Sequence, residues 1–208
     1  MSLRKAGVTG LSYEGRGERI ARGFYIPVLK ESIAYDRATG YFTVDSLVHA
    51  ASGVAGLIGN GGKMRLILGA HDVPRELWEA YQMGVRSGQE VVEEIARLIA
   101  SGLETIEDVI VKKRLEALAW MFSKGIMDVK VVLPRHFYLG QTGIFHYKLL
   151  IFRDKEGNII AANGSANETE PAYTVNGEHI SVFYSWREGD KERIDEFVQS
   201  FERIWNAE

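Results

Sequence analysis

The sequence predicts an α/β fold in which a mixed β-sheet is flanked by helices on both faces. Helical and strand-like segments alternate in the first half of the chain, whereas strand-like segments crowd together in the second half. An amphipathic helical segment then closes the chain. This order of elements is typical of a mixed sheet covered by helices. The chain has only four prolines and no stretch with the composition of a linker, so a single domain over residues 1–208 is expected.

In the first half, each element follows from an apolar pattern and the residues that bound it. The short apolar run at 63–69 has glycines at both ends, which predicts a buried strand. Asp45 fits the N-cap of a helix. The expected elements are a helix within the first 30 residues with a basic outer face, a strand at 32–35, a helix from Asp45 to about Ile58, a strand at 63–69 and helices over most of 75–124.

The second half is expected to contribute four strands and the closing helix. A strand at 128–133 is stopped by Pro134. Three further apolar runs lie at 144–152, 158–163 and 179–186. The closing helix places its apolar residues in one stripe at helical spacing. That stripe consists of Ile194, Phe197, Val198, Phe201, Ile204 and Trp205.

The composition is that of an ordinary globular protein, and it excludes several classes of function. Of the 208 residues, 46% are hydrophobic and 25% are charged. The net charge of −3 excludes a uniformly basic nucleic-acid surface, although a local basic groove is allowed. The absence of cysteine excludes disulfides, thiolate zinc sites and cysteine nucleophiles. No apolar run approaches the roughly 18 residues of a membrane span, and a cytoplasmic protein is therefore expected.

The most informative stretch is the apolar run at 144–152, because it holds His146 and Lys148. Side chains two residues apart on a strand project to the same side, about 7 Å apart along the chain. Burying an unpaired imidazole and ammonium there would be costly. The pair is therefore expected to face a pocket or a bound anion.

A second polar pair closes the next apolar run. Ser165 and Asn167 follow the strand expected at 158–163 and fall on one face. Residues 154–158 have the composition of a hairpin turn, so the two runs can pair and bring all four polar groups together. An imidazole, a cation, a hydroxyl and an amide around one point suit a phosphate and its transition state.

Together these residues form a pattern that resembles the phospholipase D superfamily. The HxK sequence at 146–148, the GSxN sequence at 164–167 and the NxE sequence at 176–178 are similar to the family's motifs and occur in the same order. The GYF sequence at 40–42 resembles a segment that precedes the first helix in phospholipase D-like nuclease domains. The resemblance covers about residues 30–186 and implies the family's αβα sandwich.

The resemblance also implies a role for each polar residue of the motifs. His146 would be the nucleophile that attacks phosphorus and forms a phosphohistidine. Lys148 and Asn167 would bind the nonbridging oxygens with support from Ser165. Glu178 would hydrogen-bond the imidazole and hold its reactive tautomer, as the carboxylate of a triad does. This chemistry implies neither a metal ion nor another cofactor.

One position departs from the family pattern. The first motif often continues as HxKxxxxD, whereas this chain has Arg153 at the matching position and Asp154 one residue later. Because that aspartate is usually structural, the departure bears more on kinship with the lipases than on catalysis.

A single copy of the motif predicts a homodimer. The mechanism implied by the resemblance needs one histidine as nucleophile and a second as general acid. In this chain His146 alone is followed by a lysine two residues later. A two-fold axis that brings the His146 of each subunit into one shared site would complete the pair. Such a dimer would also gather basic residues from both chains.

The expected function is a metal-independent nuclease that cleaves DNA or RNA through a phosphohistidine intermediate. Tyr41 and Arg16 are further candidates for substrate contact, by stacking on a base and by binding phosphate. A core position for Tyr41 and a solvated position for Arg16 are the simpler interpretations.

Two other functions stay open. The chain could be a non-catalytic nucleic-acid-binding or assembly module that works with a helicase or restriction partner. It could also be a phospholipid phosphodiesterase, although the sequence lacks an amphipathic membrane-binding helix with a basic polar face. Membrane association is therefore not expected.

Overall fold

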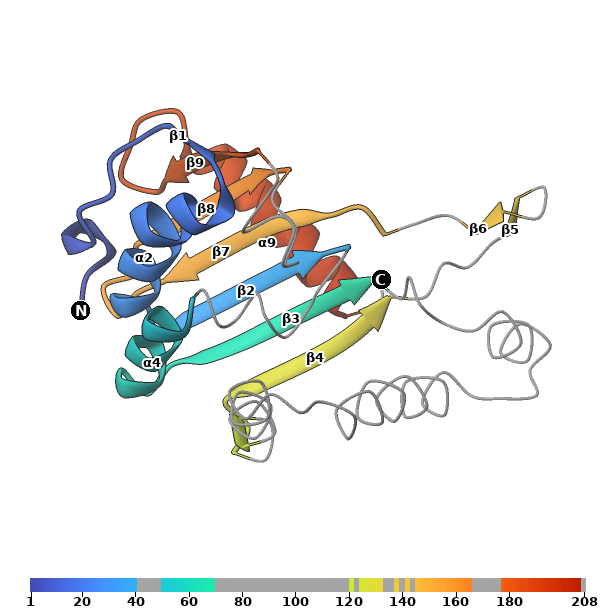
Figure 1. The fold of residues 1–208 in the computed structure, drawn as a ribbon, viewed down its shortest axis with the longest axis horizontal. Coiled ribbons are helices and arrows are strands. Elements are labelled where there is room, and N and C mark those ends of the chain that lie inside the picture. The colour runs from blue at the N-terminus through green and yellow to red at the C-terminus, as the bar shows by residue number, and fades with distance from the viewer. Residues whose placement is uncertain are drawn as a thin grey trace.

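A computed structural model describes residues 1–40, 50–69, 120–121, 124–132, 137–138, 141–142, 145–165 and 177–206. Within them, seven strands form one mixed sheet in the order β1-β9-β8-β7-β2-β3-β4 (Figure 1), and β5 pairs with β6. The elements are η1 (Leu3–Lys5), β1 (Ser12–Gly15), α1 (Gly17–Ile20), the π-helical turn η2 (Ala21–Tyr25), α2 (Ile26–Lys30), β2 (Ala34–Thr39), α4 (Ala51–Gly59), β3 (Lys63–Gly69), β4 (Met127–Val132), β5 (Phe137–Tyr138), β6 (Gln141–Thr142), β7 (Lys148–Arg153), β8 (Ile159–Gly164), β9 (Glu178–Tyr184) and α9 (Lys191–Trp205).

The strand directions bring several strand ends together at one end of the sheet. β2, β3 and β4 run parallel, whereas β1, β7, β8 and β9 pair antiparallel with their neighbours. As a result, β1, β2 and β8 end where β7 and β9 begin (Figure 1). Thr39 pairs with Lys148, and Gly15 pairs with Glu178. We call this the site end, defined by Gly15, Thr39, Lys148, Gly164 and Glu178.

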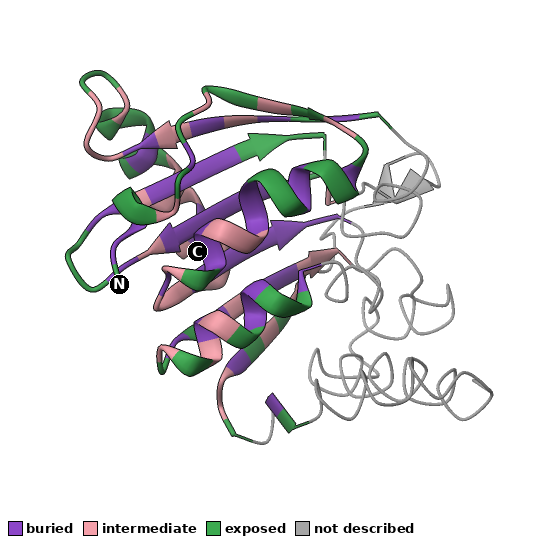
Figure 2. Cartoon of the chain, turned by 60° about the vertical axis from the view of Figure 1, so that its left-hand side comes forward, coloured by how far each residue is buried: buried purple, intermediate pink, exposed green. Residues whose placement is uncertain are grey.

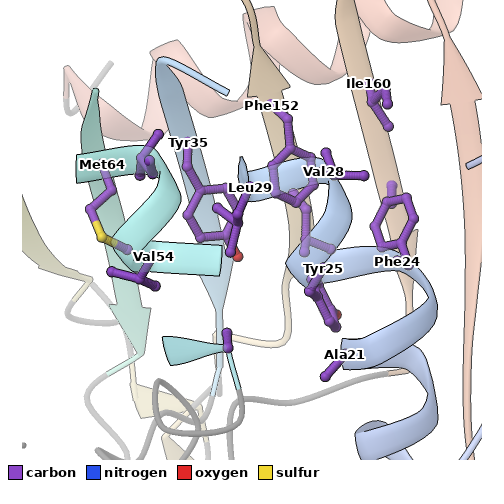
Figure 3. Packing of buried hydrophobic residues seen from close by; sticks show 14 of the residues in the cluster. Ala21, Phe24, Tyr25, Val28, Leu29, Tyr35, Val54, Met64, Phe152 and Ile160 are labelled. Carbon is purple, nitrogen blue, oxygen red and sulfur yellow. The ribbon is translucent and has the colours of Figure 1, made fainter. Parts of the chain in front are cut away.

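The first hydrophobic core lies between the sheet and the helices of the N-terminal half. Phe24, Val28 and Leu29 pack on Tyr35 of β2 and Phe152 of β7 (Figure 3). The Phe152 ring stacks on Tyr35 with 4.7 Å between centroids and meets Phe24 edge-on at 5.8 Å. The apolar residues of the helical segment recur at helical spacing, so one side of it is buried while the basic side faces solvent.

The closing helix α9 covers the opposite face of the sheet. Its Ile194 and Phe201 form a second core with Ile67, Ile151 and Ala161 of the central strands. Figure 2 shows buried residues along the central strands, which lie between the two helical layers. The predicted mixed sheet with helices on both faces is therefore confirmed. Among the described helices, none is long and apolar enough to cross a membrane.

Ion pairs join α9 to three strands on this second face. Asp36 of β2 is buried and accepts hydrogen bonds from Arg65 of β3 at 2.7 and 2.8 Å. It also pairs with Arg153 of β7, while Arg65 reaches Glu202 of α9 at 2.6 Å. A buried carboxylate is stable only when it is well paired. The two guanidinium groups therefore account for Asp36 inside the sheet.

Most predicted elements are present, with small shifts at their ends. The strand predicted at 63–69 is β3, and the one predicted at 128–133 is β4, which begins one residue earlier. The strand predicted at 32–35 is wrong in its bounds, because β2 continues to Thr39 through pairing with β7. β1 is an additional strand, whose four residues show no apolar alternation. Asp45 and nearly all of 75–124 lie outside the described residues.

Candidate active site

Lys148, the first residue of β7, is a buried cation at the site end. It is 8% exposed, and its Nζ has no hydrogen-bond partner within the described part of the chain. Burial lowers the pKa of the ammonium, the positive charge of Arg37 lowers it further, and the carboxylate of Glu178 partly offsets both effects. Because an unpaired ammonium inside a protein is costly, an anion bound here would supply a stabilising partner.

Arg37 is a second buried cation at this site, and sequence reasoning did not identify it. It lies on β2 opposite Leu150, two positions from the pair formed by Thr39 and Lys148, and it is 1% exposed. Alternation along the strand places Arg37 on the same face as Thr39. The sequence signal was weak because Arg37 follows Asp36 in a strand that reads as polar, whereas the two side chains occupy opposite faces.

Ser165 and Glu178 meet where β8 ends and β9 begins. Ser165 Oγ donates a hydrogen bond to Glu178 Oε2 at 2.5 Å and accepts one from the His179 backbone N–H at 3.0 Å. Glu178 is 7% exposed, and its charge acts on Lys148. Three of the predicted residues therefore share the site end. The carboxylate bonds to Ser165 here, and its contact with His146 stays a prediction.

The glycine that precedes Ser165 has a steric role. A Cβ atom at Gly164 would lie 2.0 Å from the carbonyl oxygen of His179 and 2.8 Å from the Cα atom of Ile180. Only glycine therefore permits the backbones of β8 and β9 to approach this closely. The close approach seats Ser165 against His179 and Glu178.

The placement of His146 corrects one prediction. The interpretation of 144–152 as a single strand is wrong at its start, because β7 begins at Lys148 and His146 precedes it with an exposed side chain. The apolar residues Phe145 and Tyr147 stack on each other before the strand begins. The exposed imidazole can be reached from solvent, and the ammonium two residues later is buried.

Arg16 also lies at the site end. It directly follows Gly15, the residue paired with Glu178, and it precedes α1 with an exposed side chain. Its guanidinium is therefore accessible to a ligand at this end. The other predicted site residues, Asn167 and Tyr41, lie outside the described residues.

The two residues at the departure from the family pattern stabilise the fold. Arg153 belongs to the ion-pair network on the face covered by α9. Asp154 is buried in the turn after β7, where it accepts hydrogen bonds from the Leu3 N–H at 2.7 Å and the Asn158 side chain at 2.8 Å. It also accepts the Glu156 and Asn158 N–H groups at 2.9 Å. Burial alone would raise the pKa of Asp154, but these hydrogen bonds outweigh burial and lower it.

The site end therefore combines charge, burial and accessibility in a way that suits an anion. Among the described residues at this end, Lys148 and Arg37 are buried cations and Glu178 is a buried carboxylate. Charge-assisted hydrogen bonds to a phosphate are strong under such conditions. Within the described ranges, no group of three or more histidine, aspartate or glutamate side chains could hold a metal ion.

Sequence comparison identifies the family of this chain. The family model described as cardiolipin synthase, PLD-like domain, matches residues 34–205. The chain belongs to this phospholipase D-like family. The match begins at β2 and spans every strand of the seven-stranded sheet except β1. The resemblance based on the motifs is thereby confirmed. A search of curated proteins finds no match.

Three solved structures share the phospholipase D-like fold of this chain. NucT from Helicobacter pylori has a TM-score of 0.55 at 14% identity, covering 94% of this chain and 95% of that one. Nuc from Salmonella typhimurium, a phospholipase D family member, has a TM-score of 0.53 at 13% identity, covering 94% and 92%. Phosphatidylserine synthase from Haemophilus influenzae has a TM-score of 0.55 at 14% identity, but the match covers 92% of this chain and only 38% of that one.

Proposed function

We propose that this phospholipase D-like chain is a phosphodiesterase that cleaves nucleic acid through a phosphohistidine intermediate, in a homodimer and without a metal ion. One observation carries the proposal: the buried ammonium of Lys148, unpartnered within the described residues, lies two residues from the exposed imidazole of His146. A phosphodiester would give the ammonium its anionic partner and bring phosphorus to the imidazole.

The reaction would proceed in two displacements at phosphorus. An imidazole nitrogen of His146 attacks phosphorus, and the bond from phosphorus to the leaving oxygen breaks. The leaving oxygen takes a proton from His146 of the partner subunit. That imidazole then removes a proton from water, whose oxygen attacks phosphorus and releases the nucleophile. One diester and one water give one monoester and one alcohol.

The remaining residues would hold the charges in place during these steps. Lys148 and Asn167 would bind the nonbridging oxygens, with the charge of Arg37 adding to the positive potential behind them. Glu178 would orient the imidazole, and Ser165 would hold Glu178 through their hydrogen bond.

Nucleic acid is the substrate that the surroundings of the site favour. Arg16 lies at the site end, and Arg19 follows it on the exposed side of the adjoining helical segment, where Arg22 is also exposed and forms an ion pair with Glu18. Exposed cations that lead away from a phosphodiester site can bind successive phosphates of a polymer. The chain also matches NucT and Nuc over nearly their whole length, whereas it spans 38% of the phosphatidylserine synthase.

The test is cleavage of a labelled oligonucleotide in EDTA by the wild type, His146→Ala and His179→Ala. His179 is the matched control, because it is also exposed beside the site and has no lysine two residues later. We expect His146→Ala to lose activity by about a thousandfold or more and His179→Ala to stay active. Cleavage that requires a divalent metal, or that survives His146→Ala, would contradict the proposal.

The shared site is tested separately by mass in solution. The chain has a mass of 23.3 kDa, and light scattering should report twice that value for the active species. Mixing an excess of His146→Ala chains with wild-type chains should reduce the activity, because mixed dimers hold one histidine where two are required. An active monomer would overturn the dimeric mechanism.

A phospholipid is the second candidate substrate, favoured by the cardiolipin synthase description of the family and by the likeness to a phosphatidylserine synthase. Liposomes assayed beside the oligonucleotide discriminate the two. Release of product from liposomes, without cleavage of the oligonucleotide, would assign a lipid substrate. Salt-dependent oligonucleotide binding without cleavage, unaffected by His146→Ala, would instead indicate a non-catalytic module of a helicase or restriction system.

A further inference from the structure

Phe145 and Tyr147 form an aromatic stack beside the candidate nucleophile. Their ring centroids lie 4.9 Å apart, and the ring planes differ by 12°. Phe145 packs against the core beneath α9, whereas Tyr147 is 43% exposed. The stack is therefore anchored in the protein at one ring and presents the other ring to solvent.

The backbone fixes this stack relative to His146. The Tyr147 carbonyl accepts a hydrogen bond from the Gly40 N–H at 3.0 Å, and the next residue, Lys148, is paired within the sheet. Side chains along a strand alternate between its two faces. Phe145 packs in the same core as Leu149, beneath α9, so the stack lies toward that face, whereas Lys148, the first residue of β7, points to the other face.

A nucleotide has a matching arrangement of groups. Its phosphate and its base lie at opposite ends of the sugar, so a phosphate at His146 leaves the base free to turn toward Tyr147. Scattered exposed aromatic residues are ordinary on protein surfaces. Tyr147 differs from these in extending a stack that reaches the core and in lying one residue from the imidazole.

We propose that the stack of Phe145 and Tyr147 is a base-binding site that selects single-stranded nucleic acid. This inference rests on the proposed function of the same site. In a duplex, each base is covered by its neighbours on both faces, so only an unstacked base can lie on the Tyr147 ring. Stacking of this kind tolerates any base, because every base has a π-face.

The test measures binding apart from cleavage by using the full chain with His146→Ala. A dye-labelled single-stranded oligonucleotide is titrated with this variant alone and combined with Tyr147→Ala, Tyr147→Phe or Trp120→Ala. We expect Tyr147→Ala to weaken binding about tenfold and Tyr147→Phe to preserve it. Trp120 is the matched control, since it is exposed near the start of β4, at the opposite end of the sheet. Trp120→Ala should leave the affinity for the oligonucleotide unchanged.

An abasic oligonucleotide of the same length separates stacking from phosphate binding. Tyr147→Ala should bind it as tightly as the parent variant does. If Tyr147→Ala weakened binding of both oligonucleotides equally, or did not weaken binding of the normal oligonucleotide, the base-binding site would be overturned. Dissociation of a dimer by Tyr147→Ala in light scattering would also overturn it, because the ring would then belong to a subunit contact.

The active chain separates this inference from the proposed function. Tyr147→Ala should raise KM for the single-stranded oligonucleotide about tenfold and leave kcat within about twofold. If the wild type binds with this dependence on the base but cleaves nothing, the proposed function fails and the base-binding site stands. If it cleaves normal and abasic oligonucleotides equally well, the base-binding site fails and the proposed function stands.

Discussion

Ser165 Oγ donates a hydrogen bond of 2.5 Å to Glu178 Oε2 and so ties the end of β8 to the start of β9. The bond is charge-assisted and therefore belongs to the stronger class of protein hydrogen bonds. The carboxylate that it holds is the buried negative charge acting on Lys148. In the proposed reaction, Ser165 would therefore be a positioning residue that acts through Glu178.

The serine hydroxyl can be tested by removing it and then restoring it. Ser165→Ala should lower kcat/KM about tenfold and the free energy of unfolding by about 1 kcal/mol, because Glu178 loses its donor. Ser165→Thr keeps a hydroxyl and should recover most of the activity. Equal activity of the two variants, measured by oligonucleotide cleavage, would show that the hydrogen bond does not position the carboxylate.

Replacing the ammonium of Lys148 should lower activity and raise stability. Lys148→Met should abolish cleavage, yet raise the free energy of unfolding by about 1 kcal/mol, because a methionine fills the space without a buried charge. Urea unfolding measures the change. Lys63→Met, at the exposed start of β3, is the control and should leave stability nearly unchanged. A destabilised Lys148→Met would show that the ammonium has a partner in the folded protein.

The stability gain from removing Lys148 should depend on pH. Burial, aided by Arg37, lowers the folded-state pKa of Lys148 below its ordinary value of 10.5. The cost of the buried ammonium is therefore fully present below the folded-state pKa and disappears as the pH rises from that pKa to 10.5. The gap in unfolding free energy between Lys148→Met and the wild type should therefore narrow as the pH rises toward 10.5. A constant gap would contradict the lowered pKa.

The site was predictable where its groups are close in sequence or carry a motif. Lys148 begins β7 and Ser165 directly follows β8, the neighbouring strand of the same hairpin, so local pattern alone brings them to the same end of the sheet. Arg37 was not predictable, because its burial depends on β2 pairing with β7, more than a hundred residues later. The exposure of His146 was missed because Phe145 and Tyr147 extend the apolar pattern beyond the true start of the strand.

Gly164 offers a steric test of the same site. Gly164→Ala should destabilise the protein by about 3 kcal/mol or displace β9, because its Cβ atom would meet the His179 carbonyl oxygen at 2.0 Å. Activity should fall with it, since Ser165 and Glu178 would separate. Gly59→Ala in α4 is the matched control, because a Cβ atom there meets nothing within 4 Å. It should raise stability by about 0.5–1 kcal/mol, and equal effects of the two substitutions would refute the steric role.

Asp154 should be a structural residue whose contribution depends on acid titration. Asp154→Ala should lower the free energy of unfolding at neutral pH by about 3 kcal/mol, because the buried Leu3 N–H and the Asn158 groups lose their acceptor. The exposed Asp195 of α9 provides the control Asp195→Ala, which should have little effect.

Unfolding measurements at acid pH decide whether the charge of Asp154 stabilises the fold in addition to its shape. Its hydrogen bonds lower the folded-state pKa below the ordinary value of 3.8, so the carboxylate stabilises the fold above pH 3.8. That contribution should be lost as the pH falls from 3.8 through the folded-state pKa. The wild type and Asp154→Ala should therefore converge in stability toward the acid end of a series of unfolding curves. A difference that stays constant down to about pH 2 would mean that the ionised form is not preferred in the fold.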